Sequence, residues 1–215
     1  LIQSCKTLSS KLALLREEVI RRWVPRKQIT TETQRIYANI CPNGSYHGEF
    51  KVVDIATNKV IKAMNYRFGV LHGKWYETVN NNYRKTCEYV DGKIHGVFKY
   101  KGGGYGLDLE TTEYVHGVKH GLHTEQWLSG GKSCKRMYKN GKLDGEAKYW
   151  MIDGLWVCCR ENYTKDKLNG ARYFYDSRGN VVRQEEWDMG CLSKVIFSSH
   201  KWYKLTFRHH LVKFI

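Results

Sequence analysis

The chain has 215 residues and a net charge of +15, and 41% of its residues are hydrophobic. That length allows one domain with a core, but no apolar run approaches the roughly 18–20 residues of a membrane helix, and no secretory signal is recognisable. Seven cysteines, an odd number without a Cys-x-x-Cys pair, argue against a disulfide framework and a zinc ribbon. We therefore expect an intracellular protein of a reducing compartment, neither secreted nor transmembrane.

Residues 1–36 are predicted to form a basic helical segment. Apolar residues recur on one helical face until a proline ends the pattern: Leu8, Leu12, Leu15, Val19 and Trp23, then Pro25. We expect this helix to cap the open edge of the first repeat, because the ends of a repeat array need covering. The alternative is a basic amphipathic helix that docks on a membrane or a partner.

A dipeptide that ends in glycine recurs through residues 37–190 at intervals of 23–25 residues. The first residue of the dipeptide is His, Asp or Asn. A further glycine, or Asp166 in one repeat, stands four residues before the glycine of the dipeptide. This pattern is turn chemistry, because Gly reaches positive φ freely and Asn, Asp and His tolerate it better than most residues. The predicted turn glycines are Gly44, Gly48, Gly69, Gly73, Gly92, Gly96, Gly117, Gly121, Gly141, Gly145, Gly170 and Gly190.

An aromatic residue stands three residues before the first turn marker in most repeats, and an aromatic-rich stretch follows the second. Strand, turn and strand in about 24 residues make one β-hairpin. One hairpin cannot bury its own face, so the hairpins are expected to stack, with the aromatic column largely buried between neighbours. The column consists of Tyr66, Tyr89, Tyr114, Tyr138, Tyr163 and Trp187.

Residues 138–150, YKNGKLDGEAKYW, resemble a MORN-type repeat in a variant form, and residues 89–100, YVDGKIHGVFKY, fit nearly as well. The other copies are degenerate, and the Tyr-x-Gly start of the standard unit is largely missing. The resemblance covers roughly residues 41–190. It implies an elongated, single-layer array of antiparallel hairpins used for protein assembly or membrane-associated scaffolding. Degenerate arrays of this kind are abundant in large DNA viruses, so a virus particle is one expected setting.

Residues 191–215 leave the repeat pattern and carry five basic residues and no acidic one. Basic and aromatic side chains alternate there, which is typical of a last hairpin with a solvated basic face or of a nucleic-acid-binding surface. We expect this strand extension to recruit a partner protein with an acidic surface. The candidate partner-binding residues are Lys201, Trp202, Lys204, Arg208 and Lys213.

No catalytic, cofactor or metal site is predicted. Equivalent histidines of successive hairpins should lie about 9–10 Å apart, too far to share one zinc ion, and Asp144 and Asn169 replace His in the same column. Cys87 and Cys134 share the parity of the aromatic column, so they are expected to be small buried groups on its face.

The predicted organisation is thus all-β, with a helical cap at 1–36, six to seven hairpin repeats at 37–190 and a basic strand extension at 191–215. The favoured function is a non-enzymatic scaffold for protein–protein assembly, without a small-molecule substrate. The alternative is a peripheral binder of anionic phospholipid or, less favoured, of nucleic acid through the basic ends.

Overall fold

The regular elements of the described residues are all antiparallel β-strands. The structure is a computed structural model, and it describes residues 15, 18, 24–79, 83–102, 107–151 and 154–199. Polar and apolar residues alternate along these strands because successive side chains of a strand point to opposite faces of the sheet. None of the described segments forms a helix with the length and apolarity that crossing a bilayer requires. The expectation of an all-β chain built from antiparallel hairpins is confirmed.

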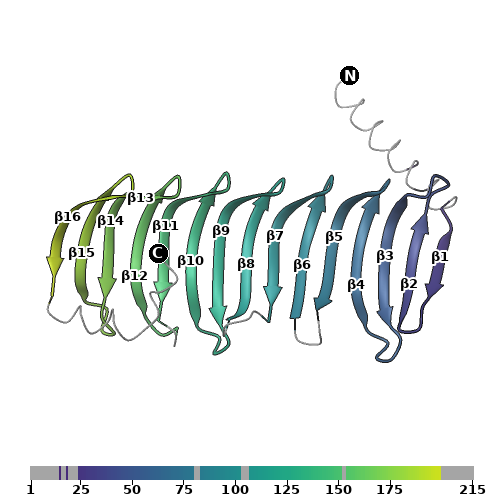
Figure 1. The fold of residues 1–215 in the computed structure, drawn as a ribbon, viewed down its shortest axis with the longest axis horizontal. Helices are drawn as coiled ribbons and strands as arrows, with labels where there is room; N and C mark the ends of the chain where they lie inside the picture. Colours follow the sequence, from purple (N-terminus) through teal and green to yellow (C-terminus); the bar gives the residue numbers. More distant parts are fainter. Residues whose placement is uncertain are drawn as a thin grey trace, which may run out of the picture. The chain divides into compact units, whose positions relative to one another are not determined.

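The chain divides into two compact units, and each is described by itself. Unit 1 comprises residues 1–81 and 86–93. Its strands lie side by side in chain order, each antiparallel to the one before (Figure 1). They are β1 (Arg26–Thr30), β2 (Gln34–Ile40), β3 (Tyr46–Asp54), β4 (Val60–Arg67), β5 (Val70–Val79) and most of β6 (Tyr83–Val90).

Unit 2 comprises residues 82–85 and 94–215. Its strands also follow chain order, except that the two-residue strand β13 pairs with β12 alone. They are β7 (Lys93–Lys101), β8 (Leu107–Val115), β9 (Val118–Trp127), β10 (Lys132–Lys139), β11 (Lys142–Trp150), β12 (Val157–Thr164), β13 (Lys167–Leu168), β14 (Gly170–Tyr175), β15 (Val181–Asp188) and β16 (Cys191–Ser198).

Short hairpin turns occupy one edge of unit 2 and longer loops the opposite edge (Figure 1). In the β8–β9 turn, φ is +47° at His116 and +85° at Gly117, and in the β10–β11 turn it is +51° at Asn140 and +83° at Gly141. Positive φ at both central residues defines the type I′ turn, whose twist matches that of the flanking strands. The turns therefore join the strands tightly without splaying them.

The core is a row of side chains that runs across the strands on one face of each sheet. In unit 1 the register aligns Ala38 with Phe50, Phe50 with Met64 and Met64 with Trp75. Ala38 and Met64 are buried in this row. In unit 2 the corresponding row passes through Thr112, His123 and Ala147, which are buried as well. The row in unit 1 is thus apolar, whereas the row in unit 2 contains polar groups.

The predicted N-terminal capping helix is not supported. Residues 8–23 lie outside the described part of the chain except for Leu15 and Glu18, and no helix is among the described elements. The side chain of Leu15, which belongs to the predicted apolar face, is 60% exposed. Helical spacing of apolar residues predicts which face of a helix is apolar, but it does not supply a surface for that face to cover.

Substitutions at two glycines of the repeat distinguish the cost of backbone strain from the cost of steric contact. Gly145 has a φ of +110°, and a Cβ built there would lie 3.3 Å from Cβ of Met137, whereas at Gly96, with a φ of +79°, it would meet nothing within 4 Å. We expect Gly96→Ala to lower the free energy of unfolding by about 1–2 kcal/mol through positive φ alone. Gly145→Ala should cost more, because the neighbouring strand must shift. Urea denaturation measures both, and equal losses would contradict this account of the hairpin stacking.

Candidate functional site

The predicted turn glycines all have positive φ. The values at the second glycine of each motif range from +74° at Gly48 to +110° at Gly145. These second glycines lie inside strands and face the aromatic column of the next hairpin, so that Gly121 is paired with Tyr138 and Gly170 with Trp187. The first glycines are turn residues. The full set is Gly44, Gly48, Gly69, Gly73, Gly92, Gly96, Gly117, Gly121, Gly141, Gly145, Gly170 and Gly190.

The His, Asp or Asn that precedes the second glycine accepts a hydrogen bond from the turn of the following hairpin. Nδ1 of His120 accepts from the backbone N–H of Asn140 at 3.4 Å, and Oδ2 of Asp144 accepts from that of Lys165 at 3.4 Å. Asn169 does the same for Met189. The three residue types replace one another because each presents an acceptor atom at this point. This column therefore holds neighbouring turns together.

The residues of the predicted aromatic column are intermediate in exposure, neither fully buried nor exposed. Four of the rings meet a ring of the preceding strand edge-on, as Tyr114 meets Phe98 with centroids 6.4 Å apart and planes at 76°, whereas the guanidinium of Arg172 lies over the Trp187 ring. No second layer of described strands covers this face. The column comprises Tyr66, Tyr89, Tyr114, Tyr138, Tyr163 and Trp187.

An ionic row crosses strands β12, β14 and β15 on the same face. Nη2 of Arg172 lies 2.8 Å from Oε1 of Glu161, and Nη1 of Arg172 lies 3.7 Å from Oε2 of Glu185. Both glutamates are buried, with 4% of their surface exposed. Arg183 pairs with Glu185 as well, and Nε1 of Trp187 donates to the same carboxylate at 2.9 Å. Buried charges are stable when they are paired and hydrogen-bonded in this way.

Three potential metal ligands meet on β9 and β10. The donor atoms of His123, Glu125 and Cys134 all lie within 4.8 Å of one another. Nε2 of His123 is 3.1 Å from Oε1 of Glu125, and its Nδ1 is 2.8 Å from Oγ1 of Thr112. His123 and Cys134 are buried. The hydrogen bond from His123 lowers the pKa of Glu125, while burial raises the pKa of the Cys134 thiol to about 12.

Sequence reasoning placed Cys134 correctly, since Cys87 and Cys134 are both buried on the aromatic face. It missed His123 and Glu125, because neither residue belongs to the turn motif by which the repeat is recognised. His123 lies two residues beyond Gly121, at a place where the other repeats carry Phe, Trp, Ala or Arg, so its position in the repeat does not by itself mark a site.

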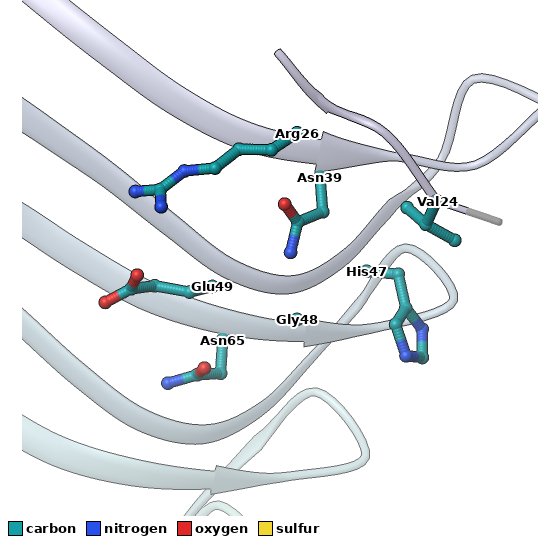
Figure 2. A pocket seen from close by; sticks show the side chains of 7 residues that line it. All are labelled: Val24, Arg26, Asn39, His47, Gly48, Glu49 and Asn65. Atoms are coloured by element: carbon teal, nitrogen blue, oxygen red, sulfur yellow. The ribbon is translucent and has the colours of Figure 1, made fainter. Parts of the chain in front are cut away.

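A shallow pocket of about 480 Å³ lies in unit 1. Figure 2 shows its polar side chains coming from neighbouring strands, with Asn39 above Gly48. Arg26 and Glu49, two of its charged groups, are exposed, so the pocket does not enclose a ligand as small-molecule sites do. It is lined by Val24, Arg26, Asn39, His47, Gly48, Glu49 and Asn65.

Strand β16 is exposed along its whole length and carries several apolar side chains. The partner-binding residues predicted beyond it lie outside the described residues: Lys201, Trp202, Lys204, Arg208 and Lys213.

The turn contacts can be tested at His120. We expect His120→Ala to lower the free energy of unfolding by about 1 kcal/mol, because the N–H of Asn140 loses its acceptor. His120→Asn should retain most of the stability, since Asn169 performs this role in a later repeat. Equilibrium unfolding compares the two variants. Equal losses in both would mean that the acceptor has no energetic role.

A pH prediction follows from Tyr163, whose hydroxyl donates to Oε2 of Glu161 at 2.7 Å. Burial, and then the charge of Glu161, raise the pKa of Tyr163 above its ordinary value of 10.0. A raised tyrosine pKa stabilises the fold below pH 10, and this stabilisation is lost as the pH rises further. Tyr163→Phe should therefore be less stable than the parent at pH 7 by about 1 kcal/mol, but decline less steeply above pH 10. Parallel alkaline declines in urea denaturation would refute this.

No family model matches the chain, and no curated protein matches it. The resemblance to MORN-type repeats stays a prediction from the residues.

Proposed function

We propose that this protein is a non-enzymatic scaffold that assembles with other proteins through its hairpin repeats, and that a partner strand joins the sheet at β16. The observation that carries the proposal is the apolar character of that exposed strand. Its apolar side chains are 41–48% exposed, and they are Leu192, Val195, Ile196 and Phe197. Exposed apolar groups gathered on one element are typical of protein-interaction surfaces.

Strand β16 also ends the strand order of unit 2. It pairs with β15 on one side, and no further described strand pairs with the other. An edge strand presents a row of N–H and C=O groups that a strand of another protein can extend. Backbone hydrogen bonds would supply part of the affinity. The apolar side chains of β16 would bury further surface on both faces of the sheet where the partner strand adds.

The first strand of unit 1 provides a contrast. Strand β1 carries Arg26 and Lys27, and charged residues are a common protection of sheet edges against pairing. Strand β16 has Lys194 as its one charged residue among four large apolar ones. This difference supports β16 rather than β1 as the edge used for assembly.

The setting proposed for this scaffold is a reducing one, inside a cell or in a virus particle. None of the six described cysteines forms a disulfide, which supports such a compartment. The resemblance to MORN-type repeats supports an assembly role in the same way.

The alternative function is binding of anionic phospholipid or nucleic acid by the basic ends. It rests on the charge of the chain, +15 in total, with five basic residues and no acidic one in 191–215. Binding that depends on phosphate contacts weakens steeply between low and moderate salt, whereas an apolar strand contact does not. Titrations with anionic vesicles and with single-stranded nucleic acid at two salt concentrations therefore separate the alternatives.

We further propose that a second copy of the chain can supply the partner strand at β16, so the full chain is tested as its own partner. We expect sedimentation velocity to show concentration-dependent association that moderate salt does not remove, because the contact is an apolar strand edge. The double variant Ile196→Lys/Phe197→Lys should remain monomeric and folded, since both side chains are exposed. The matched control is Ile29→Lys on β1, whose side chain is equally exposed and which should associate like the parent. A monomeric parent chain, or equal association of all three proteins, would contradict the proposal.

A further inference from the structure

His123 is a polar side chain at a core position that apolar residues fill in four of the other hairpins and Arg172 fills in a fifth. His123 stands directly opposite Thr112 and Arg136 in the row that crosses the sheet of unit 2. The same position holds Phe50 in β3, Trp75 in β5, Phe98 in β7 and Ala147 in β11, while in β14 it holds Arg172, which pairs with Glu161 and Glu185. His123 is 3% exposed. A buried polar group costs stability unless it is satisfied, so a break in an apolar pattern points to a function.

Two further groups with metal-ligand chemistry adjoin this histidine. Glu125 lies on the same strand and the same face, and the register sets Cys134 of β10 directly opposite Glu125. Their donor atoms and that of His123 lie within 4.8 Å of one another. Imidazole, thiolate and carboxylate are the ligands that zinc takes in proteins.

We propose that Nε2 of His123, a carboxylate oxygen of Glu125 and Sγ of Cys134 bind one Zn²⁺ ion, with water in the fourth position. Tetrahedral zinc holds its ligand atoms about 3.4 Å apart. Side-chain rotations that move each donor atom by about 1 Å would bring the three ligands to that spacing. The site does not depend on the proposed scaffold function.

Thr112 provides the supporting shell that such a histidine needs. Its hydroxyl is 2.8 Å from Nδ1 of His123 and 3.4 Å from Oε1 of Glu110. When Nε2 coordinates zinc, Nδ1 carries the proton. Its N–H then donates a hydrogen bond to this hydroxyl, which in turn donates a hydrogen bond to Glu110. Ligating histidines in metal sites are oriented by such a partner on the second nitrogen. Thr112 is itself 1% exposed, so this orientation is fixed by packing.

The charges around the site also suit a divalent cation. Glu110 is paired with Glu125 across β8 and β9, and an Arg136 nitrogen lies 3.9 Å from the Glu125 carboxylate. Two carboxylates and a cysteine thiolate carry three negative charges, which balance one Zn²⁺ and one guanidinium. The bound ion would join β9 to β10 and thereby close the loop at residues 128–131 between them.

The test uses the full chain after treatment with a chelator, titrated with Co²⁺ as a spectroscopic probe and with Zn²⁺ by calorimetry. We expect one ion per chain, a thiolate-to-cobalt charge-transfer band, and displacement of Co²⁺ by Zn²⁺. Cys134→Ala should abolish the band. Glu125→Gln and Thr112→Val should each weaken Zn²⁺ binding about tenfold or more.

Cys159→Ala is the matched control. Cys159 is buried beside a carboxylate in the next hairpin, with its Sγ 3.5 Å from Oε1 of Glu161, but Ala147 stands there in place of the histidine. This variant should bind Co²⁺ and Zn²⁺ like the parent. Absence of the charge-transfer band in the parent chain, or its loss in Cys159→Ala with retention in Cys134→Ala, would overturn the proposal. If Cys134→Ala fails to fold, the Glu125→Gln and Thr112→Val titrations decide in its place.

Discussion

The two-residue turns of the hairpins have backbone N–H groups that their own hairpins cannot satisfy, and the rest of the structure depends on where those groups bond. In the β8–β9 turn, N–H of Gly117 donates to the carbonyl of Ile94 at 2.7 Å, and N–H of His116 donates to Nδ1 of His95. The β10–β11 turn repeats the pattern with Lys119 and His120 as acceptors. A hydrogen bond of this kind contributes about 0.5–1.5 kcal/mol, so each turn is stabilised by a preceding hairpin in a fixed register.

This constraint explains why the repeat length varies so little. A hairpin that is one residue longer or shorter on the turn side would move its acceptor away from the next turn, and a slip of one residue would also exchange the two faces of the strand. Equivalent positions therefore stay aligned across strands, and each side chain lies beside the equivalent positions of the neighbouring strands. That regularity makes exceptions informative: Phe98, His123 and Ala147 occupy equivalent places, and one of the three has metal-binding chemistry.

The hairpins and their turns could be predicted from the sequence because both depend on local rules. Asp91-Gly92 and Asn140-Gly141 are strong type I′ signals, and strand alternation is visible on either side of them. The extent of aromatic burial could not be predicted, because the burial of Tyr114 depends on whether a second layer covers the sheet. The proposed site at His123 was missed for another reason. Its ligands come from two strands with a loop between them, and their proximity depends on the register of those strands.

The central claim is that the turn donors are bonded to the preceding hairpin, and amide hydrogen exchange of the turn residues tests it most directly. Turns are exposed and exchange fast when their N–H groups bond to water. The account predicts that the amides of Gly117, Gly141 and Gly190 are protected like strand residues, because each donates to a carbonyl of the preceding hairpin at 2.7–2.8 Å. Gly130, whose N–H bonds within its own loop, is the internal reference and should exchange faster. Exchange of the three turn glycines at the rate of Gly130 would contradict the account.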